Sequence, residues 1–145
     1  MPPTTHVSSL DHAGQVARAW INEVASEFDT DDREFCYRVL RAWLHTLRDR
    51  LTVEAAARFA AGLPDLIRGV FYSGWDPSWV PMKYDSRHYA GRFAHEANIS
   101  VRDADKSLKV VTAVLLRLLD EGQVRHVFEE LPREIRDLLS PSPFS

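Results

Sequence analysis

The feature that most constrains the fold is an internal repeat of helical signals. The stretch 63–68 reads LPDLIR and the stretch 131–136 reads LPREIR, which sets an offset of 68 residues. At this offset leucines fall on leucines, in the pairs Leu40 and Leu108, Leu47 and Leu115, Leu51 and Leu119, and Leu63 and Leu131. VASE at 24–27 answers FAHE at 93–96 at an offset of 69, so one residue is deleted between the first and second helices. The repeat predicts two units of four helices each, in the order medium, long, medium and short.

Apolar periodicity supports helices in both units. Residues 14–28 carry apolar side chains at spacings near 3.6, which is typical of an amphipathic helix. Thr52 is placed to cap the third helix, and Asp120 with Gln123 forms a capping box for its counterpart. The long helix expected at 104–119 is apolar almost all round, so we expect it to be the most buried. No hairpin dipeptides lie between alternating apolar runs. The sequence therefore predicts an all-α fold.

The repeat also sets the expected organisation of the chain. We expect a single domain over 1–145, formed by two pseudo-repeated four-helix units packed as one helical domain. Its expected segments are a first helical repeat at 14–72, an aromatic and proline-rich joint at 73–85, a second helical repeat at 86–139, and a tail at 140–145.

Composition limits the classes of function. The chain has 145 residues, 45% hydrophobic and 27% charged, with a formal net charge of −3. A weakly acidic chain gives no global reason to expect nucleic acid or an anionic membrane as a partner. The N-terminus lacks the basic start and apolar core of a signal peptide. Cys36 is the only cysteine, which excludes an intrachain disulfide and fits a reducing compartment. We therefore expect a cytoplasmic protein.

Residues 38–75 resemble a known family. They read RVLRAWLHTLRDRLTVEAAARFAAGLPDLIRGVFYSGW, which is similar to the signature stretch of the bacterial "domain of unknown function 2267" family. The resemblance rests on the LRDRL turn, LP, IRG and an aromatic pair before GW, and it extends more weakly over 15–140. It implies an all-helical, mostly cytoplasmic bacterial protein with no established activity, and it supplies no catalytic residues. Trp79 departs from the family pattern, in which we expect a small or charged residue.

The long helix expected at 31–50 carries a candidate basic stripe. Arg38, Arg41, His45 and Arg48 fall within about 80° of one another on a helical projection. They could bind phosphate or an acidic partner, and weak nucleic-acid binding is one alternative function. We favour the simpler interpretation, in which the stripe is a solvated polar face.

Other side chains that could carry chemistry are better accounted for by structural roles. His88 and His95 lie seven residues apart with Arg92 between them, whereas a metal pair on a helix sits at i and i+4. Cys36 lies in the apolar arc of its helix, as a buried small hydrophobe does. No nucleophile elbow, phosphate loop or dinucleotide fingerprint is present. We therefore predict no catalytic residues, no cofactor and no metal.

The joint is the least ordinary stretch of the sequence. Residues 71–85 read FYSGWDPSWVPMKYD, which concentrates aromatic side chains where prolines and a glycine prevent a regular helix. In one interpretation the tryptophans form a strap that covers the seam between the two units, and we favour it. In the other, part of this surface stays open to a partner, because Trp and Tyr are common binding hot spots. The candidate interaction surface consists of Trp75, Trp79, Lys83, Tyr84 and His88.

These observations favour a non-enzymatic protein-interaction or regulatory module, for which a stress-linked role is one version. The expected partner is another protein, without membrane and with nucleic acid disfavoured; the oligomeric state is not predicted. An alternative of another class is a small-molecule binder or hydrolase with a pocket between the repeats. That pocket would be lined by Trp75, Trp79, Tyr84 and His88.

Overall fold

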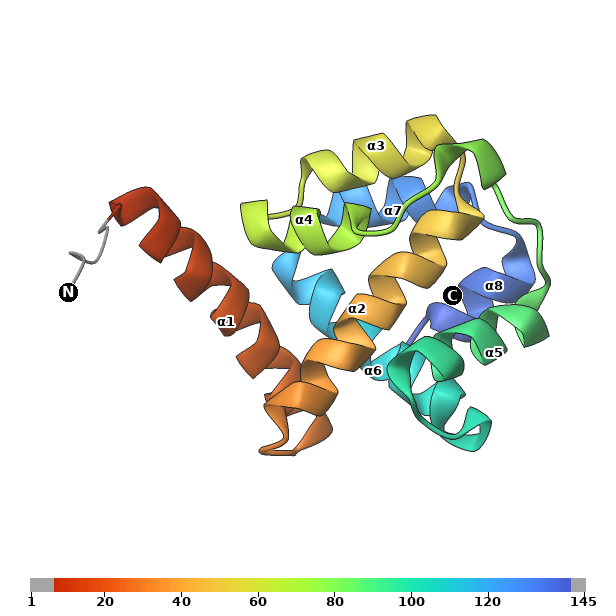
Figure 1. Cartoon of the computed structure of the whole chain (residues 1–145). Helices are drawn as coiled ribbons and strands as arrows, with labels where there is room; N and C mark the ends of the chain where they lie inside the picture. The colour runs from red at the N-terminus through yellow and green to blue at the C-terminus, as the bar shows by residue number, and fades with distance from the viewer. Residues whose placement is uncertain (1–6, 142–145) are drawn as a thin grey trace.

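A computed structural model describes residues 7–141 of the chain and shows only helices and their connections over that range (Figure 1). It contains eight α-helices and two 3₁₀ turns. They are α1 Ser8–Phe28, α2 Arg33–Arg50, α3 Val53–Ala61, α4 Asp65–Tyr72, η1 Pro77–Trp79, α5 Ser86–Ala97, η2 Val101–Asp103, α6 Ala104–Leu118, α7 Glu121–Glu129 and α8 Arg133–Leu139. The all-α prediction is confirmed. Residues 142–145 of the predicted tail lie outside the described range.

Several helix boundaries recur at the spacing seen in the sequence. The start of α3 and the start of α7 are 68 residues apart, as are the ends of α2 and α6. The residues that terminate α1 and α5, Asp29 and Asn98, are 69 apart, and both adopt the left-handed conformation with φ of 55° and 57°. In each, the backbone N–H bonds to carbonyls of the preceding turn, which closes the helix. The division of the chain into two units stays a prediction.

The left-handed conformation at these two helix ends has a steric cost for any residue that carries a Cβ. Replacing Asn98 with glycine is expected to raise the free energy of unfolding by up to about 1 kcal/mol, because glycine adopts positive φ without steric cost. Asn98→Ala is the control and is expected to destabilise, since alanine lacks the local hydrogen bonding that helps asparagine tolerate this conformation. Urea denaturation followed by circular dichroism measures both. Equal stability of the glycine and alanine variants would contradict the assignment of this cap.

Helix α2 is the centre of the molecule. It contacts α1, α4, α5 and α6, and Figure 1 shows it crossing the middle of the fold. Its buried residues are Cys36, Val39, Leu40, Ala42, Trp43, Leu44, His45, Thr46, Leu47 and Arg48. A larger share of α2 is buried than of α6, so the expectation that the helix at 104–119 is the most buried was wrong. Periodicity alone missed this because the polar side of α2 is covered as well as its apolar side.

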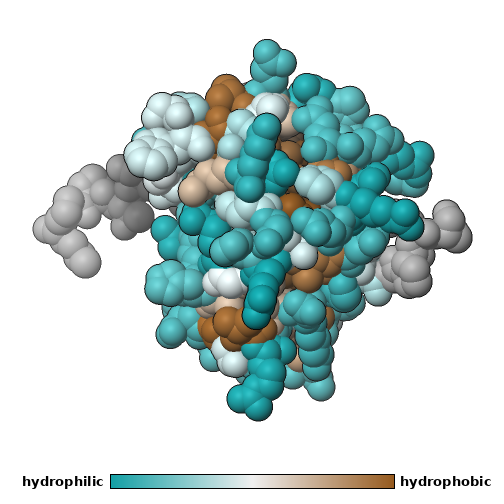
Figure 2. All heavy atoms as spheres, turned by 90° about the vertical axis from the view of Figure 1, so that its right-hand side faces the viewer, coloured by the Kyte–Doolittle hydropathy of each residue, from teal (hydrophilic) through white to brown (hydrophobic). Residues whose placement is uncertain are grey.

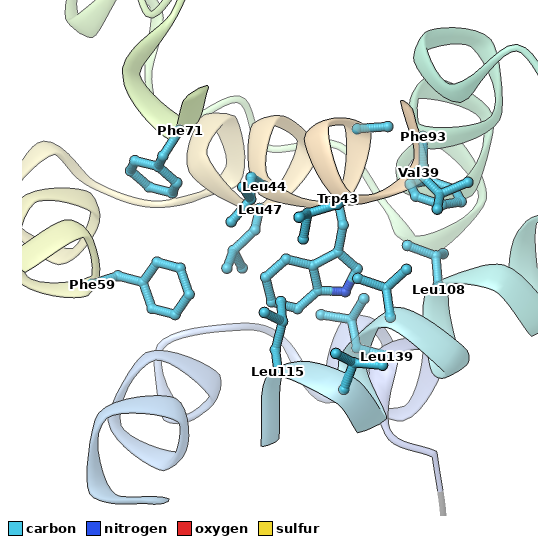
Figure 3. Close-up of a cluster of buried hydrophobic side chains, with 14 of the residues drawn as sticks. Val39, Trp43, Leu44, Leu47, Phe59, Phe71, Phe93, Leu108, Leu115 and Leu139 are labelled. Atoms are coloured by element: carbon cyan, nitrogen blue, oxygen red, sulfur yellow. The ribbon is translucent and has the colours of Figure 1, made fainter. Parts of the chain in front are cut away.

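One hydrophobic core draws residues from all eight helices. Figure 3 places the Trp43 indole between α2 and side chains from helices before and after the joint, among them Phe59 on one side and Leu108 and Leu139 on another. The two long helices α2 and α6 touch, and each is covered by a helix distant in sequence, α2 by α5 and α6 by α1. The halves of the chain are therefore interleaved and share their packing surfaces.

Details at the helix ends differ from expectation in two places. Helix α1 begins at Ser8, ahead of the predicted start at residue 14, and its first turns are largely exposed. Thr52 caps α3 as predicted, by accepting from the N–H of Ala55. The predicted capping box of α7 does not form, because Asp120 makes no side-chain cap and Gln123 donates instead to the carbonyl of Phe59 on α3. A tertiary hydrogen bond has replaced the local one.

Candidate functional site

The predicted basic stripe on α2 is mostly covered by neighbouring helices, so it is neither the open cationic stripe nor the fully solvated polar face expected from the sequence. His45 and Arg48 are only 4% and 5% exposed, and Arg38 and Arg41 are half-buried. The reason is that α5 and the end of α4 lie over this side of α2. The four side chains therefore cannot present a continuous surface to phosphate, nucleic acid or an acidic partner.

Two of the arginines instead hold the ends of neighbouring helices. The guanidinium of Arg48 donates to the carbonyls of Phe71 and Ser73 at 3.0 and 2.8 Å, and Arg38 donates to the carbonyl of Ala97 at 3.0 Å. Phe71 and Ala97 lie in the last turns of α4 and α5, where carbonyls lack partners within the helix. Arg48 also pairs with Asp49 at 2.9 Å. The stripe thus fixes where α4 ends and the joint begins.

His45 links three helices without leaving a nitrogen for a substrate. Its Nδ1 pairs with the Glu96 carboxylate on α5, and its Nε2 donates to the carbonyl of Val70 on α4 at 2.6 Å. Arg41 lies 3.7 Å from the same carboxylate. A histidine that acts as a general base needs one nitrogen within reach of the substrate. Because both nitrogens of His45 are occupied inside the protein, this pair is structural.

The joint is held against the end of α2. Asp76 accepts from the N–H of Ser78 at 3.0 Å and so caps the short η1 turn. The N–H of Met82 donates to the carbonyl of Asp49 at 2.7 Å, and the Tyr84 hydroxyl donates to the carbonyl of Thr46 at 2.8 Å. Burial raises the pKa of Tyr84 above its usual range, which keeps that hydroxyl protonated as the bond requires. These bonds hold the joint in place within η1 and after it.

The two tryptophans of the joint have different roles. Trp75 is half-buried, with its ring 5.3 Å from that of Tyr72, which in turn lies 5.3 Å from the core ring of Phe71. Trp79 is 71% exposed. Trp75 therefore packs against the end of α4, whereas Trp79 is open to solvent. Whether Trp75 forms the expected strap over a seam between two units stays a prediction. Figure 2 faces the side to the right of Figure 1, where the joint passes, and shows apolar residues there as separate patches among hydrophilic ones.

Two hollows adjoin beside the joint. The smaller, of about 210 Å³, is lined by Trp79 and its neighbours Asp49, Gly74, Asp76, Val80 and Met82. The larger, of about 660 Å³, lies between α2 and α5 and is lined by Thr46, Asp49, Arg87, His88, Gly91, Arg92, His95 and Glu96. Asp49 borders both. Neither hollow is lined by all four of Trp75, Trp79, Tyr84 and His88, since Trp79 lines the smaller hollow and His88 the larger.

The remaining predicted site residues lie at the edges of this surface. Lys83 is exposed in the joint. His88 is exposed and pairs with Asp85 at 3.0 Å, and the N–H of His88 donates to the same carboxylate, which lowers the pKa of Asp85. Cys36 is buried in α2, and burial raises the pKa of its thiol, as expected for a structural cysteine. Trp79, Lys83 and His88 are thus exposed to solvent, while Trp75 and Tyr84 anchor the joint.

Sequence reasoning missed most of the α5 side of this surface. Arg87, Gly91 and His95 are spaced by four residues, so they follow one face of the helix. Arg92 lies 3.3 Å from Asp49 and 5.2 Å from the centre of the Tyr84 ring. From the sequence, only His88 of this helix was placed in the candidate interaction surface, and His95 was considered only in a metal pair that its spacing disfavours. The available signal was a glycine in the middle of a row of cationic and histidine side chains.

The fold and this surface define an all-helical protein with an aromatic joint set beside a polar hollow. A family model described as "Uncharacterized conserved protein (DUF2267)" matches residues 17–138, and the chain belongs to that family. A comparison with curated proteins gives no match. No helix among residues 7–141 combines the length and apolar character needed to cross a membrane.

Proposed function

We propose that the protein is a protein-interaction module with a regulatory role, and that it binds its partner through the joint with Trp79 as the anchor. The observation that carries the proposal is the 71% exposure of Trp79 on a capped turn. Large aromatic side chains left open to water are favoured anchors because they remove much apolar area on binding. The buried free thiol of Cys36 is compatible with a reducing compartment, and we place the module in the cytoplasm.

The way the joint is held supports this role. Hydrogen bonds from Met82 and Tyr84 to α2, and from Arg48 to the end of α4, fix the backbone on both sides of η1. A surface that is already ordered loses little conformational entropy when a partner docks. The hollow beside Trp79, about 210 Å³, is smaller than the roughly 300–1,000 Å³ usual for drug-sized ligands. It suits a single side chain of a protein partner better than a free metabolite.

Site-specific photocrosslinking tests the proposal. The full chain is made in its native cells with p-benzoylphenylalanine at position 79 and, as a matched control, at position 101. Val101 is 65% exposed, on the η2 turn rather than the joint. We expect ultraviolet light to produce a discrete heavier adduct from position 79 alone, identified by mass spectrometry as one protein.

The control separates a site from simple exposure. Equal adducts from both positions, or none from position 79 in a protein that melts like the wild type, would contradict the proposal. An adduct specific to position 79 should also be competed by added wild-type protein and not by added Trp79→Ala protein.

A further inference from the structure

We propose that the hollow between α2 and α5 binds an acidic, carboxylate-rich segment of the partner protein. This inference rests on the proposed interaction role, since the hollow and the Trp79 surface share Asp49 as a common border. It adds the chemical character of the partner, which neither the family nor the joint supplies.

The hollow is open along α5 because Gly91 has no side chain. Gly91 lines it, one helical turn from Arg87 and one from His95. A Cβ built at Gly91 would meet no atom within 4 Å, so the backbone of α5 is open to the hollow at this point. On the opposite side, the Thr46 hydroxyl donates to the carbonyl of Ala42 in its own helix. The result is a recess of about 660 Å³, with room for several side chains of a partner.

The carboxylates that line the hollow are already neutralised from behind. Asp49 accepts from Arg48 at 2.9 Å and lies 3.3 Å from Arg92. Glu96 pairs with His45 and with Arg41. The lining itself carries Arg87 and Arg92 against Asp49 and Glu96. Adding Arg41 and Arg48, which pair with these carboxylates from outside the lining, and Asp85, which pairs with His88, gives four positive charges against three negative ones, before any charge on a histidine. Arg87 and His95 make no ion pair or side-chain hydrogen bond with any residue in 7–141.

A locally positive recess on a chain of net charge −3 selects for an acidic ligand. A carboxylate placed over Gly91 would lie between Arg87 and Arg92 and gain charge-assisted hydrogen bonds. Nucleic acid fits less well, because a phosphate backbone needs a longer track of cations.

The experiment uses the full chain as bait for a displayed library of random short peptides. Recovered peptides are then synthesised and their affinities measured by fluorescence anisotropy at low and high salt. The bait variants are Arg87→Glu, which reverses a charge with no partner in the described residues, Gly91→Gln, which fills the recess, and Trp79→Ala, which removes the proposed anchor. The matched controls are Arg102→Glu, another exposed arginine without a side-chain partner in that range, and Gly69→Gln, another helical glycine whose Cβ would meet nothing within 4 Å.

We expect the recovered peptides to be enriched in Asp and Glu and to bind more weakly as salt rises. Arg87→Glu and Gly91→Gln should each weaken binding by about tenfold or more, and the two controls should leave it unchanged. Loss of the fold does not account for such a result with Gly91→Gln, because glutamine favours a helix more than glycine does. Melting curves of all variants check this.

Three outcomes would overturn the inference. Peptides without acidic enrichment that are lost with Trp79→Ala but not with Arg87→Glu would leave the proposed function standing and remove the proposal that the recess binds an acidic segment. A mixed-sequence oligonucleotide that binds more tightly than the peptides and is lost with Arg87→Glu would assign the recess to phosphate. Recovery of no peptide at all would count against both proposals. Acidic peptides that need Arg87 but not Trp79 would instead keep the recess and remove the anchor.

Discussion

Replacing Trp43 with alanine is expected to lower the free energy of unfolding by about 3–5 kcal/mol. Trp43 is 1% exposed and lies at the centre of the core, with the Phe59 ring 6.3 Å away (Figure 3). Its Nε1–H donates to the Thr112 hydroxyl of α6 at 2.9 Å, and that hydroxyl donates onward to the carbonyl of Leu108. Truncation therefore removes a large buried surface and the hydrogen bond that joins α2 to α6. Urea denaturation followed by circular dichroism gives the value.

A domain of ordinary stability, about 5–15 kcal/mol, has little margin for a change of this size, so a milder variant accompanies it. Thr112→Val keeps the shape of the side chain but leaves the indole N–H without its acceptor, at an expected cost of about 1–3 kcal/mol. Trp43→Ala costing less than Thr112→Val would contradict the central position of the indole.

The second large effect is expected at Arg48. Arg48→Met should lower the free energy of unfolding by about 1–3 kcal/mol, because Asp49 keeps only its longer 3.3 Å contact with Arg92 and buried polar groups lose a partner. The carbonyls of Phe71 and Ser73 lose their donor as well. The joint should then loosen, which trypsin reports directly by faster cleavage after Lys83.

Arg41→Met is the matched control on the same helix. Its side chain is 41% exposed and lies 3.7 Å from Glu96, so its loss should cost no more than about 1 kcal/mol. Cleavage after Lys83 should stay at the wild-type rate in this variant. If Arg48→Met and Arg41→Met lowered the free energy of unfolding and changed the cleavage rate after Lys83 equally, the proposed role of Arg48 in holding the joint would be wrong.

The contrast between these arginines shows what the sequence could predict about the fold. Periodicity placed the helices correctly, because each helix has an apolar face that needs no knowledge of its neighbours. It also grouped Arg38, Arg41, His45 and Arg48 on one side of α2, and they are on one side. What it could not predict is what covers that side, since the covering helix α5 begins 36 residues after α2 ends. Burial of a polar face depends on tertiary partners and not on local spacing.

The candidate site was predicted only in part, because the exposure of its residues also depends on tertiary partners. Trp79 stood out as an aromatic residue outside any helix, and the structure leaves it exposed. Trp75 and Tyr84 could not be separated from it by composition, although one stacks on Tyr72 and the other bonds to Thr46. The recess over Gly91 was missed because a hollow depends on two helices together, and a lone glycine within a helix does not by itself indicate one.

The interleaving of the helices has a consequence for how the protein is made. When the ribosome has released the chain as far as the joint, α2 is complete, but α5 and α6, which cover two of its sides, have yet to emerge. Glu96, the partner of His45, arrives 51 residues after it. A nascent chain at this stage exposes the apolar surface of α2 together with His45 and Arg48, whose side chains are buried in the folded protein. Exposed apolar surface of this kind favours aggregation. Productive folding of the core must therefore wait until α5 and α6 have been synthesised and have left the ribosome.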